Sequence, residues 1–183
     1  MWTKDKLESF MKNYGFKPNL TKPEIKELPE ILHPEEKLLG LVEGLLKKIH
    51  NREISGHGLV IATNKRVIFF RKSFIGTVTK EETPISKISS ASFRKGFLTS
   101  SIAIVTSNNE SEVDNCDKIL GKKFIDIVQN LISELDQITN SPNNVQSIQE
   151  SSVSQLEKLF ELKQKGILTD DEFNTQKIKI LSQ

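Results

Sequence analysis

Gly58-Leu-Val-Ile-Ala-Thr63 and Arg66-Val-Ile-Phe-Phe-Arg71 are two short apolar runs, separated only by Asn64-Lys65. Both runs contain the β-branched or aromatic residues that favour strands. A two-residue connection that includes Asn, which tolerates a positive φ, is typical of a tight turn between antiparallel strands. This stretch therefore predicts a β-hairpin.

Further strand-like segments lie on both sides of this hairpin. They are Lys37–Leu46, Lys80–Thr83, Ile85–Phe93 and Phe97–Thr106, and Asn108-Asn109 follows the last of them as a turn. No helical pattern interrupts these segments, so the sequence favours an antiparallel sandwich or small barrel over units with crossover helices.

One long helix is predicted after the strands, from about Lys118 to Gln137. Apolar residues recur in it at spacings of three and four, as expected of a helix with one buried face. These residues are Ile119, Leu120, Phe124, Ile127, Val128, Leu131, Ile132 and Leu135. A stripe this wide indicates a helix that closes an open end of the barrel.

Residues 1–33 are predicted to form an N-terminal helical arm. Thr3–Tyr14 has the pattern of a short amphipathic helix, with Thr3 as its N-cap and Gly15 as its stop. Three prolines (Pro18, Pro23 and Pro29) follow closely, and proline disfavours regular helix. We therefore expect an irregular arm over Phe16–His33, whose apolar residues make it a candidate contact surface.

The C-terminal part divides into a polar linker, 139–152, and a two-helix hairpin, 153–183. The linker has almost no apolar residues, a composition typical of flexible segments. In the hairpin, Gly166 can end the first helix, and Thr169 and Glu172 have the spacing of a capping box that starts the second. So small a unit cannot bury a core alone, and we expect it to bind a protein partner or a copy of itself. The predicted contact residues are Leu156, Leu159, Leu162, Gly166, Ile167, Thr169, Glu172, Phe173 and Leu181.

The composition argues against several classes of function. The formal net charge is +2, which does not by itself require nucleic acid or an anionic membrane. The single cysteine, Cys116, excludes an internal disulfide, and the N-terminus lacks the apolar core of a signal peptide, so we expect a soluble, cytoplasmic protein. His50, Glu53 and His57 match no common metal-ligand spacing. We expect no enzyme activity, no metal, no cofactor and no small-molecule substrate.

The basic residues offer an alternative function. Lys47, Lys48 and Arg52 are predicted on the first inter-strand loop, where they could make weak, nonspecific contact with anionic lipid, together with Trp2 at the N-terminus. Nucleic-acid binding is disfavoured, because acidic residues are interspersed with Arg94, Lys95, Lys122 and Lys123 and no aromatic residues alternate with them.

Several local motifs resemble known families. His33-Pro34-Glu35-Glu36-Lys37 before the first strand, the Thr63-x-x-Arg66 hairpin, and Pro84-Ile85-x-x-Ile88 resemble bacterial PH domains of the YokE-like type. The order Leu-x-x-Leu-x-x-Leu, Gly-Ile-Leu-Thr and Glu-Phe within 156–173 resembles the SHOCT (short C-terminal) domain. The resemblance implies an α+β fold: a PH-like antiparallel barrel or sandwich over 34–138, capped by one C-terminal helix. It also implies a non-catalytic binding or adaptor protein that self-associates or docks a protein partner through the SHOCT-like hairpin.

Overall fold

The computed structural model describes residues 2–140 together with Phe160, Lys163, Phe173, Asn174, Gln176 and Lys177. The chain divides into two compact units, Met1–Gln137 and Ile138–Gln183, which are described separately.

The first unit is built on one curled antiparallel sheet of seven strands in the order β4-β3-β2-β1-β7-β6-β5. The strands are β1 (Leu38–Ile49), β2 (Arg52–Thr63), β3 (Arg66–Lys72), β4 (Val78–Pro84), β5 (Ile88–Lys95), β6 (Ser100–Thr106) and β7 (Glu110–Cys116). A single turn of 3-10 helix, η1 (Ile85–Lys87), joins β4 to β5, and these two strands form the edges of the sheet. The predicted antiparallel architecture is confirmed.

Two hairpin turns differ from their predicted form. The β1–β2 connection is a tight turn at His50 and Asn51, with φ of 48° and 65°, and it replaces the longer loop expected between these strands. The β2–β3 turn does not use a positive φ at Asn64. Side chains hold it instead: the hydroxyl of Thr63 accepts from the N–H groups of Lys65 and Arg66, both at 3.1 Å.

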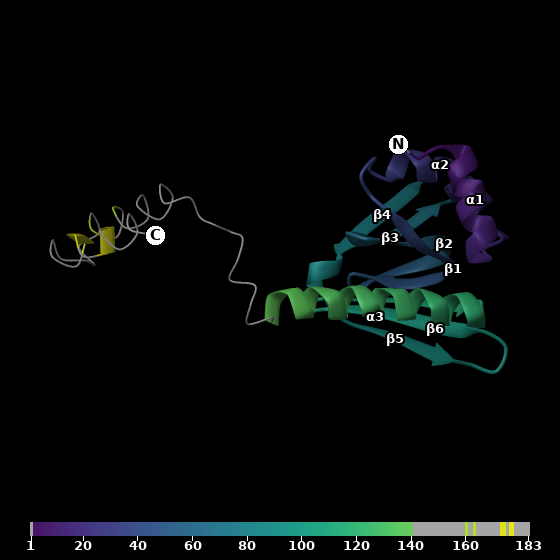
Figure 1. Cartoon of the computed structure of the whole chain (residues 1–183). Helices are drawn as coiled ribbons and strands as arrows, with labels where there is room; N and C mark the ends of the chain where they lie inside the picture. Colours follow the sequence, from purple (N-terminus) through teal and green to yellow (C-terminus); the bar gives the residue numbers. More distant parts are fainter. Residues whose placement is uncertain (1, 141–159, 161–162, 164–172, 175, 178–183) are drawn as a thin grey trace. The chain divides into compact units, whose positions relative to one another are not determined.

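The helix α3 (Lys118–Asn140) closes the concave side of the sheet, as predicted (Figure 1). Phe124 and Val128 are fully buried, and Leu131 and Leu135 pack against the same core. Ile119 departs from the predicted stripe, because 78% of it is exposed. The core of the barrel lies between this helix and the inward residues of the strands, among them Val60 and Phe69.

The N-terminal residues cover the opposite face of the sheet. The helices α1 (Lys4–Tyr14) and α2 (Lys22–Ile31) lie together over β1–β3 (Figure 1) and bury a second core. This core contains the outward residues of the strands, such as Leu59 and Ile68, together with Leu7 and Leu28. Because both faces are covered, 58–63 and 66–70 are buried without alternation.

The irregular arm expected over Phe16–His33 is wrong, since α2 occupies 22–31 of it. Pro23 stands in the first turn, where an N–H has no helical partner to lose. Pro29 costs the helix one hydrogen bond, and the helix ends two residues later at Ile31. Contacts from the sheet stabilise the helix: the carboxylate of Glu43 on β1 accepts from the N–H groups of 19–21 and from the Thr21 hydroxyl at 2.7 Å.

Trp2 belongs to this second core and does not face outward as the lipid alternative requires. Its indole N–H donates to the Glu36 carbonyl at 2.9 Å, and its ring packs edge-to-face on Phe10. Thr3 caps α1 through its side chain, and Gly15 ends the helix with φ of 88°, as predicted. The apolar face of the N-terminal segment is thus occupied within its own domain.

Candidate functional site

The conspicuous polar cluster of the domain lies where the second hairpin meets the segment before β1. The Arg66 guanidinium donates from Nε and Nη2 to the two oxygens of Glu36, at 2.8 Å and 3.0 Å. The same group donates to Glu82 on β4 and, at 3.2 Å, to the Ile31 carbonyl at the end of α2. Only 1% of the Glu36 side chain and 11% of the Arg66 side chain are exposed.

The electrostatics of this cluster favour the charged pair. Burial by itself raises the pKa of Glu36, but the hydrogen bonds from Arg66 and from the His33 N–H outweigh it, so the pKa lies below the usual range. The pKa of Glu82 is lowered in the same way, with Lys80 and Arg66 outweighing burial. Arg66 therefore ties the second hairpin to the segment before β1, to β4 and to the end of α2. Arg66 thus serves a structural role.

The basic residues proposed to contact lipid lie on strands and are paired with carboxylates. Lys47 and Lys48 belong to the end of β1, and Arg52 begins β2. Lys47 pairs with Asp114 at 3.1 Å, Lys48 with Glu110 at 2.9 Å, and Arg52 with Glu81. These pairs reduce the positive potential that would attract anionic lipid to this end of the sheet.

The histidines of this region are also engaged within the domain. His50 Nε2 lies 2.9 Å from the Thr83 hydroxyl, and His50 Nδ1 lies 3.4 Å from Glu81. His57 lies within β2. In the part of the chain that the structure describes, no three His, Cys, Asp or Glu side chains converge as a metal site requires.

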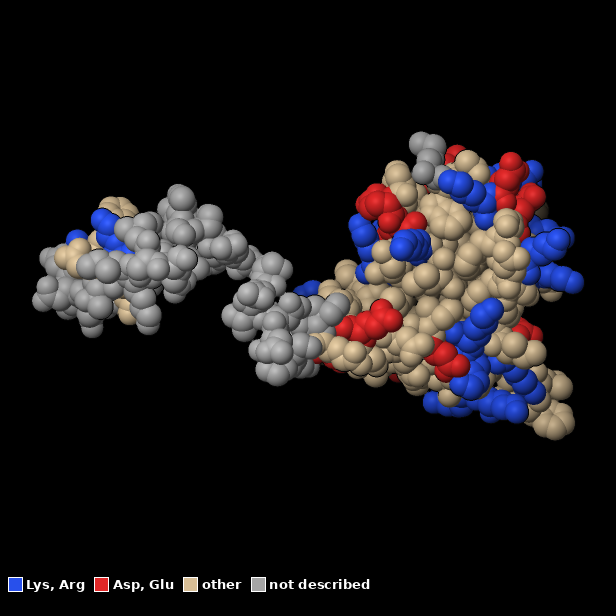
Figure 2. Space-filling view, viewed as in Figure 1, with Lys and Arg blue, Asp and Glu red and all other residues tan. Residues whose placement is uncertain are grey.

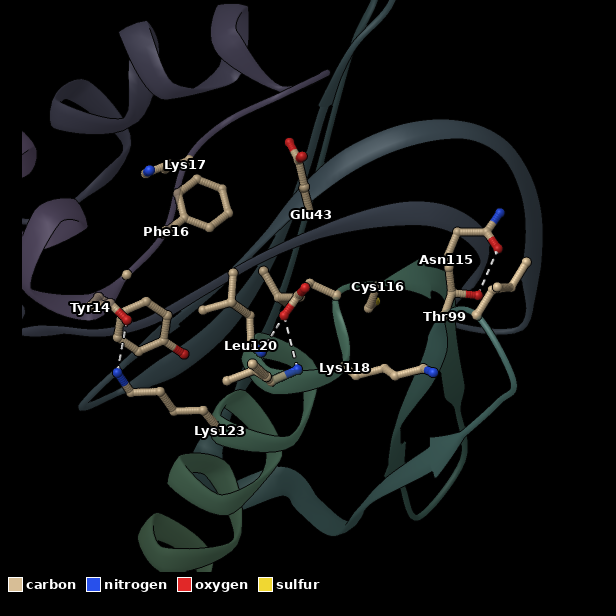
Figure 3. Close-up of a pocket in the computed structure, with 15 residues that line it drawn as sticks. Tyr14, Phe16, Lys17, Glu43, Thr99, Asn115, Cys116, Lys118, Leu120 and Lys123 are labelled. Atoms are coloured by element: carbon tan, nitrogen blue, oxygen red, sulfur yellow. Dashed lines mark hydrogen bonds between the residues drawn. The ribbon is translucent and has the colours of Figure 1, made fainter.

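A groove of about 820 Å³ lies between the end of α1 and the start of α3, beside the ends of β6 and β7 (Figure 3). Lys123 bridges its two walls: the ammonium donates to the Tyr14 carbonyl at 2.9 Å and lies 4.0 Å from the centre of the Tyr14 ring. Asp117 accepts from the N–H groups of Ile119 and Leu120, so its carboxylate serves as the cap of α3. Sequence reasoning missed this groove, because its walls come from opposite ends of the domain.

The titratable groups of the groove are poorly suited to catalysis. Burial, with smaller contributions from Asp114 and Asp117, raises the pKa of the Cys116 thiol to about 12, so the thiol stays protonated near neutral pH and is a weak nucleophile. Burial likewise raises the pKa of Tyr14 to about 12. This groove can bind or pack, but it presents no activated nucleophile.

The described residues of the C-terminal unit agree with a helix pair. Phe160, Lys163, Phe173, Asn174, Gln176 and Lys177 are all helical. The rings of Phe160 and Phe173 meet edge-to-face at 6.5 Å, and the Lys163 ammonium lies 4.8 Å from the centre of the Phe173 ring. Of the predicted contact residues, Phe173 alone falls within the described part of the chain; Leu156, Leu159, Leu162, Gly166, Ile167, Thr169, Glu172 and Leu181 lie outside it.

The fold, a curled antiparallel sheet closed by a C-terminal helix, defines the PH-like class. The family model described as "Bacterial PH domain" matches residues 32–130, more than half of the chain, and the chain belongs to this family. The model described as "Short C-terminal domain" (SHOCT) matches residues 154–181. A comparison with curated proteins finds no match.

Solved structures with similarity to the chain include two bacterial proteins and one human protein. A DUF1696 family protein with a pleckstrin-homology domain from Shewanella loihica is 19% identical, with 64% of this chain and 92% of that chain covered and a TM-score of 0.38. A pleckstrin homology domain from Shewanella amazonensis is 18% identical, with 62% and 95% covered and a TM-score of 0.36. The hSac2 domain of the human phosphoinositide phosphatase Sac2 is 10% identical, with 77% and 88% covered and a TM-score of 0.41.

PH-like and SHOCT domains are typically non-catalytic modules of protein interaction or membrane association. The pair indicates a binding or adaptor role. Among the described residues, no helix is long and apolar enough to cross a membrane.

Proposed function

We propose that the chain is a non-catalytic adaptor in which the SHOCT hairpin mediates self-association or docks a protein partner. The observation that carries this proposal is the exposure of Phe160. Its ring meets Phe173 within the hairpin, yet 51% of the residue stays exposed. A unit of this size cannot bury its aromatic residues alone, and a second chain would cover them.

The covered core faces of the PH-like domain also support this proposal. Its apolar sheet faces are covered from within, on one side by α3 and on the other by α1 and α2. The domain therefore does not require a partner to complete its core. In the C-terminal unit, by contrast, the described residue Phe160 leaves half of its surface for a partner to cover.

Light scattering coupled to size exclusion tests the proposal. The full chain, a truncation ending at Asn140 and the double variant Leu159→Ser/Phe173→Ser are compared for molar mass. We expect the full chain to be an oligomer and the other two to be monomers, with an unchanged melting temperature of the PH-like domain. Gln176→Ser, at an exposed polar position of the same unit, is the matched control and should keep the wild-type mass.

The heteromeric form of the proposal has its own readout. If the full chain is a monomer, immobilised full chain should retain a protein from lysate of the source organism, and Leu159→Ser/Phe173→Ser should release that protein while Gln176→Ser retains it. Self-association or retention that persists in the double variant contradicts a docking role for the hairpin.

A further inference from the structure

Two hairpin turns of the PH-like domain repeat one sequence pattern. Arg71-Lys72-Ser73-Phe74-Ile75 ends β3, and Arg94-Lys95-Gly96-Phe97-Leu98 ends β5. In each, an Arg-Lys pair at the end of the strand is followed by a small residue and then by a phenylalanine and an aliphatic residue in the turn. The four turn residues project into solvent: Phe74 is 107% exposed, Ile75 86%, Phe97 93% and Leu98 81%.

These apolar residues are unusual for their positions. Gly, Asn, Asp, Pro and Ser dominate tight turns because they suit the backbone and the solvent. Phe97 and Leu98 occupy the two central positions of a turn that closes with the Gly96 N–H on the Thr99 carbonyl at 2.9 Å, and neither side chain adds to a core. Large apolar residues at turn positions, where they add nothing to core packing, are expected where they serve binding.

The two tips differ in whether their basic residues are engaged by the rest of the domain. At the Phe74 tip the basic residues are held by the domain: Lys72 donates to Glu27 on α2, and the Arg71 guanidinium covers Gly56 so closely that an added Cβ there would lie 2.1 Å from its Nε. At the Phe97 tip, Arg94 and Lys95 are exposed, and no described carboxylate lies within ion-pair distance of either.

The start of α3 adds three further lysines beside the Phe97 tip: Lys118, Lys122 and Lys123. Lys118 donates to the Phe97 carbonyl and so braces the turn. The nearby carboxylates are Asp117, which caps α3, and Asp126, which pairs with Lys122 at 2.8 Å. Lys123 is already engaged by the Tyr14 carbonyl, so Arg94, Lys95 and Lys118 are the cations around the tip with which no described carboxylate forms an ion pair. Figure 2 shows Lys and Arg gathered over this part of the domain, next to a projecting tip of other residues.

The same surface contains a third exposed apolar residue. Ile119, in the first turn of α3, is 78% exposed, and it lines a hollow of about 600 Å³ between β5 and α3 together with Phe93, Lys95, Lys118 and Lys122. Apolar side chains at the tip and lysines around it form the arrangement that binds a lipid interface: the apolar groups enter the acyl boundary, and the cations meet anionic headgroups.

We propose that the Phe97-Leu98 tip, together with Ile119 and the surrounding basic residues, docks the PH-like domain on an anionic lipid membrane. A standard protein interface buries roughly 800 Å² per partner, whereas insertion into a bilayer needs only the apolar side chains of a projecting tip. Charge complementarity selects anionic lipid. At the β1–β2 end, by contrast, Lys47, Lys48 and Arg52 each have a carboxylate partner.

Vesicle co-sedimentation of the full chain tests the proposal. The probes are vesicles of phosphatidylcholine alone and of phosphatidylcholine mixed with phosphatidylserine, each at low and high salt. Wild type should bind the mixed vesicles only, and salt should weaken the binding. Phe97→Ser/Leu98→Ser should lower the partition coefficient roughly ten-fold or more. Arg94→Glu/Lys95→Glu should lower it by at least about five-fold for each charge removed.

Phe74→Ser/Ile75→Ser is the matched control, because it removes the same exposed apolar groups from the tip whose cations are engaged, and it should bind as wild type does. All four positions are exposed, so melting temperatures should not change. The proposal is overturned if wild type ignores phosphatidylserine, if the two serine variants lose binding equally, or if Lys47→Glu/Lys48→Glu abolishes binding while Arg94→Glu/Lys95→Glu does not. A change in molar mass without a change in vesicle binding would identify the tip as a protein contact and also overturn it.

Discussion

Replacing Glu36 by alanine is expected to destabilise the PH-like domain severely. The carboxylate is almost fully buried, accepts two hydrogen bonds from Arg66 at 2.8 Å and 3.0 Å, and accepts a third from the His33 N–H at 3.0 Å. Its removal leaves Arg66 buried with Glu82 as its remaining carboxylate partner. Breaking a buried pair on one side costs about 3–5 kcal/mol. For a domain of this size that corresponds to a decrease in melting temperature of about 10–15 °C.

Urea denaturation followed by circular dichroism measures this free energy directly, with Glu35→Ala as the control. Glu35 is the neighbouring residue and also pairs with a cation, Lys65, at 3.3 Å, but 59% of its side chain is exposed. Its loss should leave the denaturation midpoint within error of wild type, since exposed pairs contribute little. A decrease for Glu36→Ala below about 1 kcal/mol, the size typical of exposed pairs, would refute the reasoning that this pair holds α2, the segment before β1 and the hairpin together.

Four further predictions concern the same domain. The pKa values of Glu36 and Glu82 are lower in the folded state, so the unfolded state binds more protons as the pH falls. The stability that these two carboxylates contribute should therefore be present above about pH 4.5, the ordinary value, and be lost as the pH drops below it; acid titration of wild type should show this dependence, and Glu36→Ala should show less of it. Leu131→Ala should cost about 2 kcal/mol in denaturant melts, at the low end for a buried leucine because Leu131 is half-buried, and a cost near zero would mean that α3 does not pack on the barrel. Leu28→Ala should cost about 2–5 kcal/mol, since Leu28 on α2 is fully buried in the second core; an unchanged midpoint would show that the N-terminal helices are dispensable. Cys116 should react with a thiol reagent only after unfolding, and rapid labelling of the native protein would contradict its burial and raised pKa.

The elements that could be predicted from sequence are those whose signal is local. The β2–β3 hairpin is predicted by two apolar runs around a short turn. The helix α3 is predicted by apolar residues with a period of 3.6, and Phe124, Val128 and their neighbours from this stripe are buried in the barrel. The helix α2 could not be predicted, because its prolines oppose helix locally and its stabilising contacts come from Glu43, more than twenty residues away. Tertiary contacts override propensity there.

The candidate sites show the same limit. Local spacing and order suffice to predict the SHOCT domain that the family model matches at residues 154–181, and the family resemblance points to the segments that contain Glu36 and Arg66. The pairing of Glu36 with Arg66 could not be predicted, because the two residues are thirty positions apart and no sequence periodicity connects them. The exposed tip at Phe97 and Leu98 was misassigned to a strand beginning at Phe97, since large apolar residues in a turn look like strand residues.

The two free edges of the sheet have a consequence for how copies of this chain can assemble. An open sheet could extend from molecule to molecule through backbone hydrogen bonds, and so give fibres of indefinite length. Here β4 carries Lys80, Glu81 and Glu82 and ends at Pro84, which has no N–H to donate, while β5 has a register irregularity between Ile88 and Ser90 and ends in Arg94 and Lys95. Charge, proline and irregular register all discourage edge-to-edge pairing. The proposed assembly would instead use the C-terminal SHOCT hairpin, which is far in sequence from both edge strands. Such an assembly can stay finite, because the sheet itself resists polymerisation.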